Sequence, residues 1–340
     1  MRFPWPLRYK TGIKRWDWTW EEPRSTTLSE QEPDPDAPAA ADAETAPAPP
    51  AALRRRRAAF ALGATFVVIV AVLLLTLAGG GGSSPHSAVV RTGARHAVAP
   101  RLDATEEAAL VNHREDAAID RVLSYTPAIT EGGSKGKELA LTFDDGPGPY
   151  TEELVGVLNR LHVHATFFAI GEEERYFSGG TRLELRSGDT VGDHTETHPM
   201  MAALSRHDQH EELLEQIARI ELLGGPRPRL FRPPYGSFDA TTFKELHAMR
   251  LLMVLWSTDT ADYTLPGVQA IVQRALAGAH PGAIILMHDA GGNRAETIAA
   301  LPAIIAGLRR RGLQPVTIPR LMLDDPPPAG RPIPTSLAGD

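Results

Sequence analysis

Between residue 137 and about residue 320, short apolar runs alternate regularly with amphipathic stretches. The apolar runs are 139–143, 165–170, 190–192, 230–231, 252–256, 283–287 and 314–318. After the first run, Leu154, Val157, Leu158 and Leu161 recur at the i, i+3, i+4, i+7 spacing of a helix with one buried face. Strands that alternate with helices favour a parallel sheet, either a barrel or an open sheet. We therefore predict an α/β fold of about seven parallel strands.

Polar residues follow the apolar runs at the point where each predicted strand ends. They are Asp144-Asp145 after the first strand, Asp193-His194 with His198 after the third, Arg232 after the fourth, Asp259 and Asp262 after the fifth, and His288-Asp289 after the sixth. In a parallel α/β barrel, the reactive groups gather at the carboxyl ends of the strands. We expect these side chains to meet at one rim.

Each of these signals is weak by itself. Asp145-Gly146-Pro147 is a common kind of turn sequence, and an HxxxH spacing indicates a metal only when a third ligand is near. A histidine after a strand is more often structural. However, all five signals fall on the same end of successive strands, whereas chance would distribute them over both ends. That coincidence favours a functional site.

The residue types at this rim fit a catalytic metal centre. One carboxylate and two imidazoles make a three-ligand site with open positions, as in catalytic rather than structural zinc sites. The chain has no cysteine, so thiolate ligands, thiolate catalysis and disulfides are excluded. A cation would offset the charge of Asp145, and Arg232 would offset that of Asp144. Asp144 would then be free to act as a base.

The ordered motifs resemble those of a known family. "LTFDDGP", "GDHTETHP", "RPPYG", "STDTADY" and "ILMHD", with "ATFFAIG" at 165–171, are similar to the motifs of the NodB-homology polysaccharide deacetylases, carbohydrate esterase family 4. The resemblance covers roughly residues 137 to 320. It implies a distorted (β/α) barrel and metal-dependent removal of acetyl groups from N-acetylated sugar polymers. Zn²⁺ is the expected metal, and Co²⁺ or Ni²⁺ would also suit these ligands.

The resemblance also implies a role for each matching residue. Asp144 would be the general base, Asp145, His194 and His198 the metal ligands, Arg232 the partner that orients Asp144, His288 the general acid and Asp262 the residue that holds it; Tyr235 would give its backbone N–H to the oxyanion, and Leu286 would line the acetyl pocket. The sequence departs from the family twice. Tyr263 stands where tryptophan is usual, next to the acetyl pocket, and Asp193 stands where asparagine is common, which would add negative charge near the metal.

The segment before this domain predicts a membrane anchor. Residues 58–78 are 21 apolar residues without a charge, and about 20 such residues span a bilayer as a helix. Arg54 to Arg57 precede them, so the positive side would remain cytoplasmic and the C-terminal part would lie outside. The alternative is a cleaved signal peptide, whose apolar region is normally shorter and nearer the N-terminus. We expect a single-pass protein of the cell membrane.

The predicted organisation has five parts. They are a disordered cytoplasmic tail at 1–53, the basic flank and transmembrane helix at 54–78, a linker and lead-in helix at 79–136, the deacetylase-like domain at 137–321, and a C-terminal tail at 322–340. The lead-in helix begins at Asp103, a suitable N-cap residue.

The expected function is removal of N-acetyl groups from an extracellular polysaccharide, peptidoglycan first. Chitin oligomers and O-acetylated xylan remain as alternative substrates, and an inactive glycan-binding homologue remains as an alternative protein. A serine esterase is not favoured, because we find no G-x-S-x-G elbow of the kind that carries its serine between a strand and a helix. The net charge of −7 gives no indication of nucleic-acid binding. The expected partners are therefore an N-acetylated cell-wall polysaccharide and, through one helix, the membrane.

Overall fold

The computed structural model describes residues 104–336. The predicted cytoplasmic tail, the apolar run at 58–78 and Asp103 lie outside these residues. Within 104–336, no helix combines the length and apolar character needed to cross a bilayer. The organisation of the N-terminal hundred residues therefore stays a prediction.

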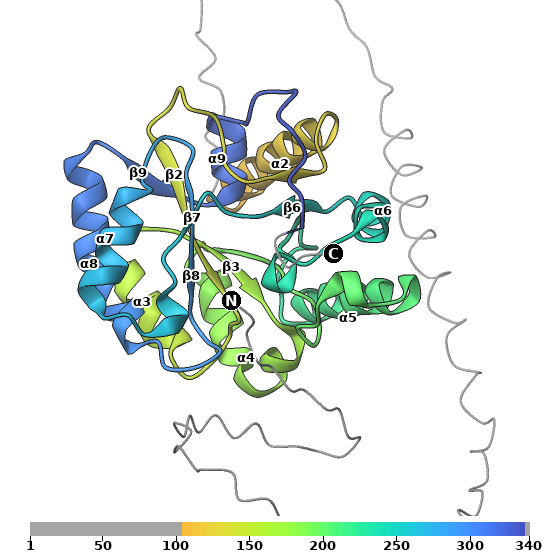
Figure 1. Cartoon of the computed structure of the whole chain (residues 1–340), viewed down its shortest axis with the longest axis horizontal. Coiled ribbons are helices and arrows are strands. Elements are labelled where there is room, and N and C mark those ends of the chain that lie inside the picture. Colours follow the sequence, from red (N-terminus) through yellow and green to blue (C-terminus); the bar gives the residue numbers. More distant parts are fainter. Residues whose placement is uncertain (1–103, 337–340) are drawn as a thin grey trace, which may run out of the picture. The chain divides into compact units, whose positions relative to one another are not determined.

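A parallel sheet forms the centre of the described domain (Figure 1). Its strands are β1 (Ala128–Ile129), β2 (Glu138–Asp144), β3 (Thr166–Ala169), β4 (Thr190–Asp193), β5 (Leu230–Phe231), β6 (Leu252–Val254), β7 (Thr258–Asp259), β8 (Ile284–His288) and β9 (Gln314–Val316). Eight of them follow the order β1-β6-β5-β4-β3-β2-β8-β7, and β9 pairs with the start of β2. Every strand pairing in this sheet is parallel.

Helices surround the sheet, with α3, α7 and α8 on one side and α5 and α6 on the other (Figure 1). The helices are α2 (Ala104–Leu123), α3 (Thr151–Arg160), α4 (Gly171–Arg186), α5 (Arg206–Leu222), α6 (Ala240–Met249), α7 (Val268–Ala277), α8 (Ala295–Arg310) and α9 (Ile318–Asp324). Short 3₁₀ turns follow three strands: η1 (Met201–Ala203), η2 (Pro234–Gly236) and η3 (Asp262–Thr264). The lead-in helix is confirmed as α2, which packs against α9.

The sheet is curved around an apolar interior, as expected for a distorted barrel. Ala140, Phe168, Leu230, Leu252 and Ile284 come from five different strands yet belong to one buried cluster. In the described chain the end strands β1 and β7 do not pair with each other, so the barrel is incompletely closed. Side chains of α2 and α9 complete this cluster, which fills the barrel behind the rim where the strands end.

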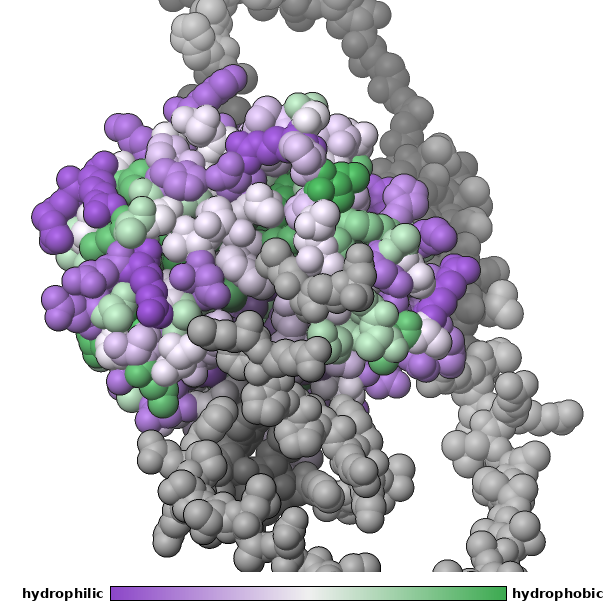
Figure 2. Space-filling model, in the orientation of Figure 1, coloured by the Kyte–Doolittle hydropathy of each residue, from purple (hydrophilic) through white to green (hydrophobic). Residues whose placement is uncertain are grey.

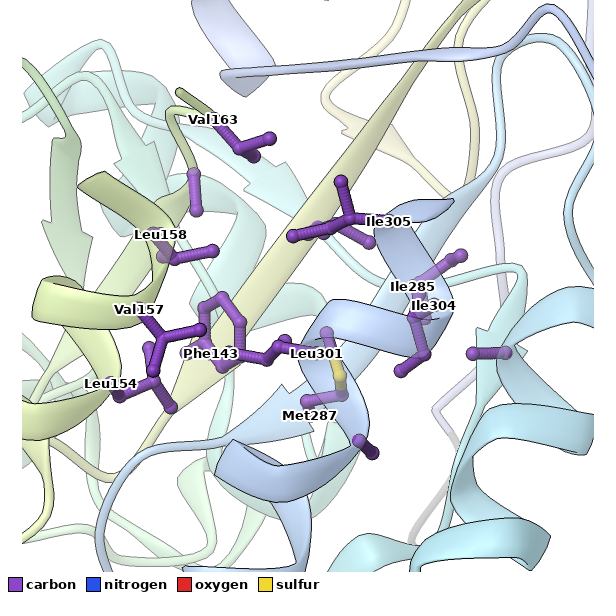
Figure 3. Close-up of a cluster of buried hydrophobic side chains, with 14 of the residues drawn as sticks. Phe143, Leu154, Val157, Leu158, Val163, Ile285, Met287, Leu301, Ile304 and Ile305 are labelled. Atoms are coloured by element: carbon purple, nitrogen blue, oxygen red, sulfur yellow. The ribbon is translucent and has the colours of Figure 1, made fainter. Parts of the chain in front are cut away.

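The opposite face of β2 explains why its sequence is almost entirely apolar. Leu139, Leu141 and Phe143 point away from the barrel interior into a second core. Figure 3 shows Phe143 between side chains of α3 and side chains of α8 and β8. Because residues alternate between the two faces of a strand, Ala140, Thr142 and Asp144 point inward. The hydrophobic pattern of β2 thereby aims the first aspartate into the barrel.

The predicted strand count was too low. All seven predicted strands are present, and β1 and β7 are additional. Each of these two strands has only two residues, too few to show an alternating pattern. At the other end of the domain, α9 continues across the boundary expected at residue 321. Beyond it, the Asp325 carboxylate accepts hydrogen bonds from the backbone N–H groups of Lys135 and Gly136.

The outer surface is mixed in character. On the face shown in Figure 2, hydrophobic residues are scattered among hydrophilic ones and do not form one broad patch. A mixed surface of this kind is ordinary for a folded domain. The exposed apolar side chains that are relevant to function lie around the rim where the strands end.

Candidate metal and active site

The first site element is the pair of aspartates at the end of β2. Asp144 is buried, and its Oδ1 accepts a hydrogen bond of 2.7 Å from Arg232 Nη1. Asp145 has a φ of 72°, in the left-handed region, so the chain turns sharply between the two residues. The turn directs the carboxylate of Asp145 toward the two histidines after β4.

Arg232 is fully buried, and hydrogen bonds and an aromatic ring hold its guanidinium in position. Its guanidinium donates to Thr142 Oγ1 at 2.9 Å and to the carbonyls of Val254 and Leu255, and it lies over the ring of Phe168. Burial lowers the pKa of Arg232, while Asp144 acts in the opposite direction. A guanidinium nevertheless stays charged at neutral pH. The positive charge required next to Asp144 is therefore permanent.

Asp145, His194 and His198 form a cluster that fits a metal ion. One ligand atom from each residue lies within 4.8 Å of the others, and Asp145 Oδ1 is 3.6 Å from His194 Nε2 and 3.2 Å from His198 Nε2. His194 Nδ1 lies 2.6 Å from the carbonyl oxygen of Arg232. Since a carbonyl can only accept, Nδ1 carries the proton and Nε2 presents its lone pair to the cluster. Two imidazoles and a carboxylate suit a divalent transition metal.

The loops that carry these groups contain several non-glycine residues in the strained, positive-φ region. Eight non-glycine residues of the described chain have positive φ, and six of them lie in the site loops. These six are Asp145, Thr195, His198, Tyr235, Ala261 and Leu265. Backbone strain of this kind persists only where surrounding structure imposes it, and it concentrates at active sites. Local hydrogen bonds impose it here: the His198 N–H donates to Thr195 Oγ1, and the Thr195 N–H donates to Asp193 Oδ1.

His288 and Asp262 form the second charged pair of the rim. His288 Nδ1 lies 2.7 Å from Asp262 Oδ1, and the His288 backbone N–H donates to Asp262 Oδ2. Burial would lower the pKa of His288, but the Asp262 carboxylate and, more weakly, Asp145 and Asp144 raise it to about 9. Burial likewise works against ionisation of Asp262, but His288 holds the pKa of this carboxyl below its usual value. His288 is therefore protonated at neutral pH and can donate a proton.

Three further predicted residues lie around these groups. The Tyr235 hydroxyl is 3.1 Å from His198 Nδ1, and the two rings meet edge to face. Tyr263 is half exposed and packs edge-on against the His288 ring. Leu286 is buried on β8, two residues before His288. Apart from Leu286, which lies within β8, the residues predicted for the site are thus on loops or strand ends.

Comparison with known proteins identifies this arrangement. The polysaccharide deacetylase family model matches residues 131–254. Over 197 residues the chain is 34% identical to a peptidoglycan-N-acetylglucosamine deacetylase of Bacillus cereus, covering 55% of this chain and 88% of the relative. Over 202 residues it is 35% identical to a chitooligosaccharide deacetylase of Sinorhizobium fredii, covering 56% and 94%. The chain belongs to the polysaccharide deacetylase family.

The fold agrees with this assignment. The crystal structure of the Bc1960 peptidoglycan N-acetylglucosamine deacetylase matches at a TM-score of 0.57 and 30% identity, covering 60% of this chain and 96% of that one. The family resemblance inferred from the five motifs is confirmed.

One departure from the deacetylase motifs has a different consequence from the one expected. Asp193 is fully buried at the end of β4. Burial, together with nearby glutamates, raises its pKa well above the usual value. The shift favours the neutral acid over the carboxylate, so it opposes the negative charge expected near the metal ligands. A protonated aspartate has nearly the shape of the asparagine that is common at this position in the deacetylases.

Asp193→Asn should consequently be a mild substitution. The amide keeps an oxygen that can accept from the Thr195 N–H, so the turn that carries His194 is preserved. We expect metal content and kcat/KM within about twofold of the wild type. Asp193→Leu, which removes the acceptor, is the matched contrast and should lose activity. A large loss of activity in Asp193→Asn would show that the ionised carboxylate is required.

The structure adds one residue that the sequence did not indicate, Thr297, and gives a partner to Asp289, which was expected at the rim. Thr297 on α8 is buried and donates to Asp262 Oδ2 at 2.7 Å. Asp289 is buried and accepts a hydrogen bond from the Thr151 hydroxyl. Thr297 lies outside the quoted deacetylase motifs, and Asp289 lies within "ILMHD" but had no predicted role. Both residues act through a partner far away in the sequence. Only the tertiary structure brings them together.

The expectation that the chain has no G-x-S-x-G turn requires a correction. Residues 132–136, "GGSKG", have the G-x-S-x-G spacing of a serine hydrolase turn. The structure places Ser134 in an exposed bend that leads into β2, with no helix following it. A nucleophile turn connects a strand to a helix. The pattern is therefore incidental in this deacetylase domain, and a serine esterase stays unsupported.

Thr297 should act by holding Asp262 in place. Thr297→Val removes one hydroxyl from a buried carboxylate at nearly constant volume, and a hydrogen bond to a charged group contributes about 1.5–3 kcal/mol. We expect kcat on a deacetylase substrate to fall by about tenfold, with KM and metal content unchanged. Thr297→Ser, which retains the hydroxyl, should restore most of the rate. An unchanged kcat in the valine variant would contradict the role of Thr297.

Proposed function

We propose that this protein is a metal-dependent hydrolase that removes N-acetyl groups from an extracellular polysaccharide, most directly from peptidoglycan amino sugars. One observation carries the proposal. The candidate ligands Asp145, His194 and His198 lie on the same rim as two charged pairs, Asp144 with Arg232 and His288 with Asp262. Hydrolysis of an amide needs a base that activates water and an acid that protonates the departing amine. The two pairs supply one of each.

The proposed role of Asp144 is that of the base. Arg232 occupies Oδ1 of Asp144, and Asp144 Oδ2 lies 3.8 Å from His194 Nε2, on the side of the candidate ligands. The free oxygen is therefore directed to where water would be activated. A divalent cation held by Asp145, His194 and His198 would lower the pKa of water and polarise the acetyl carbonyl. Zn²⁺ is the first candidate, with Co²⁺ and Ni²⁺ as alternatives.

His288 is the proposed acid. The acetyl carbon gains the oxygen of water, the amide C–N bond breaks, and the amine of the sugar takes a proton from His288 while acetate leaves. Asp262 holds the imidazolium and stabilises its charge. Leu286 and Tyr263 are proposed to contact the acetyl group, and the backbone N–H of Tyr235 is proposed to bind the oxyanion.

The substrate class follows from the relatives. One relative is named for peptidoglycan N-acetylglucosamine and another for chitooligosaccharides. Both are polymers of N-acetylated amino sugars, which favours N-deacetylation over the O-acetylated xylan alternative. An inactive glycan-binding protein would be expected to lack one of the reacting groups, but Asp144, Asp145 and His288 are all present.

Mass spectrometry tests the proposal directly. The purified full-length chain is incubated with peptidoglycan fragments, chito-oligomers and acetylated xylan, each with added Zn²⁺. Loss of 42 Da per acetyl group from the peptidoglycan fragments is the expected result. Loss from chito-oligomers alone would favour the alternative N-acetyl substrate. No loss from any of the three would support the inactive glycan-binding protein.

The proposed location is the outer side of the cell membrane. The apolar run at 58–78 and Arg54 to Arg57 support this orientation. Protease added to intact spheroplasts should digest the C-terminal domain and leave an N-terminal epitope tag protected, as followed by immunoblot. A protected domain with a digested tag would contradict the proposed orientation.

A further inference from the structure

A recess of about 250 Å³ lies beside the proposed active site. Gly148, Pro149 and Glu152 line it from the segment that joins β2 to α3, and Tyr176, Phe177 and Gly179 line it from α4. Gly148 is three residues beyond the candidate ligand Asp145. The recess is therefore lined by the segment that directly follows the candidate ligand, although the reaction proposed above makes no use of it.

The recess exposes two adjacent aromatic side chains. Tyr176 is 66% exposed and Phe177 is 37% exposed. The backbone of α4 departs from helical geometry at Phe177, with φ −121° and ψ 33°, so both residues face outward at a kink. An ordinary amphipathic helix would bury at least one of two such large apolar groups. Their shared exposure indicates a surface that binds something.

The two glycines that follow have different roles. A Cβ on Gly180 would lie 2.7 Å from the Cβ of Pro147, so glycine is needed there for close packing. A Cβ on Gly179 would meet only the Glu152 carboxylate, at 3.3 Å. Close packing therefore does not require glycine at 179. The missing side chain instead leaves space beside the aromatic rings.

Glu173 lies on α4, one helical turn before Tyr176. Burial raises the pKa of Glu173 to about 7, and the charges of Glu172 and Asp145 add to this effect. The influence of Asp145 places Glu173 within electrostatic range of the ligand cluster. Other exposed apolar side chains, Met200, Tyr235 and Tyr263, are on the loops after β4, β5 and β7. The rim is thus bordered by apolar groups on several sides.

We propose that the recess at Tyr176 and Phe177 is an outer sugar-binding subsite. It would take one pyranose unit of the same glycan whose acetylated unit lies at Asp145, and in this respect the inference rests on the proposed function. The apolar C–H face of a pyranose packs against an aromatic ring, and its hydroxyls donate to a carboxylate such as that of Glu152. The volume is of the order needed for one sugar ring. The Glu152 carboxylate at the recess disfavours an anionic ligand, so the unit is a neutral or amino sugar.

Steady-state kinetics on two chain lengths test the subsite. The substrates are N,N′-diacetylchitobiose and the N-acetylglucosamine pentamer, and the enzyme is the full-length chain with Zn²⁺. The wild type should have a higher kcat/KM on the pentamer, because only the longer chain reaches the recess. Replacing both Tyr176 and Phe177 with alanine should raise KM for the pentamer about tenfold with kcat unchanged, which is the pattern for lost uniform binding. The dimer should be affected less than twofold.

A second variant and a control complete the design. Gly179→Leu fills the recess without removing an aromatic ring, and it should produce the same chain-length-dependent rise in KM. Leu222→Ala is the control: it removes an apolar side chain that is 78% exposed at the end of α5. This variant should leave KM and kcat unchanged on both the dimer and the pentamer. Equal losses on dimer and pentamer would indicate a structural role and overturn the subsite.

The outcomes separate the subsite from the proposed function. If the wild type deacetylates both oligomers and the variants have the same kinetics, the subsite is overturned and the proposed function stands. A wild type that neither deacetylates nor binds the pentamer, by calorimetry, contradicts both. Variants that change the oligomeric mass of the protein but not KM would identify the recess as a protein interface, which also overturns the proposal.

Discussion

His194→Ala should abolish most metal binding and nearly all activity. Its Nε2 is one of three ligand atoms within 4.8 Å of one another, and its ring is fixed by the bond from Nδ1 to the Arg232 carbonyl. Removing it leaves a carboxylate and one imidazole, whose side chain is 22% exposed. Loss of a partner that merely orients a ligand reduces metal affinity by about 10–100-fold. Loss of the ligand itself should exceed that range, so we expect metal content near background by elemental analysis.

The control for this variant is His247→Ala. His247 is exposed on α6, outside the rim, and its removal should leave both metal content and turnover unchanged. Circular dichroism of both variants separates metal loss from unfolding. Full metal stoichiometry in His194→Ala would remove this residue from the ligand set, and a wild-type rate would refute the proposed site.

The sequence was sufficient to predict where the reactive residues meet. Strands such as β2 and β8 are buried on both faces, so they are recognisable as apolar runs, and the polar residue that follows each run is easily found. Asp144, His194 and His288 lie at the ends of such strands. A parallel sheet brings these ends to one rim whatever the details of the loops. That is why the spatial cluster could be predicted without knowing a single distance.

Other features depend on tertiary contacts that leave no local pattern. β1 pairs with β6 across more than a hundred residues of sequence, and two residues carry no periodicity. Thr297 reaches Asp262 from α8, and any buried threonine on that helix would look the same in the sequence. Gly180 packs closely against Pro147, which comes from the segment after β2. In each case the cause is a partner distant in the chain.

The charge of Asp193 is a feature that residue type alone does not predict. From the sequence alone, Asp193 is predicted to carry a negative charge, because aspartate is normally ionised. Its fully buried position opposes that charge, since burial raises the pKa of the carboxyl and favours the neutral acid. Asp144 is buried almost as deeply but has Arg232 against it. A buried carboxyl therefore cannot be assigned a charge from its residue type without knowing its partners.

Asp144→Asn and His288→Ala should each lose most of the turnover while retaining the metal. Asp144 is bonded to Arg232 and His288 to Asp262, so neither needs to be a ligand. Base or acid catalysis by a positioned group contributes about 10²–10⁴-fold. We expect kcat to fall within that range for each variant, with metal content by elemental analysis close to that of the wild type. Loss of metal in Asp144→Asn would make Asp144 a ligand instead of the base.

The pH dependence distinguishes the acid from the base. His288 must be protonated to donate, and the neighbouring carboxylates raise its pKa to about 9. The protonated fraction falls as pH rises through that pKa, so the wild-type rate should decline on the basic side. A bound divalent cation adds positive charge nearby and lowers the pKa of the imidazolium, which puts the basic limb at or below about 9. This limb should disappear in His288→Ala and persist in Asp144→Asn. A basic limb that survives in His288→Ala, or near wild-type turnover in that variant, would exclude His288 as the acid.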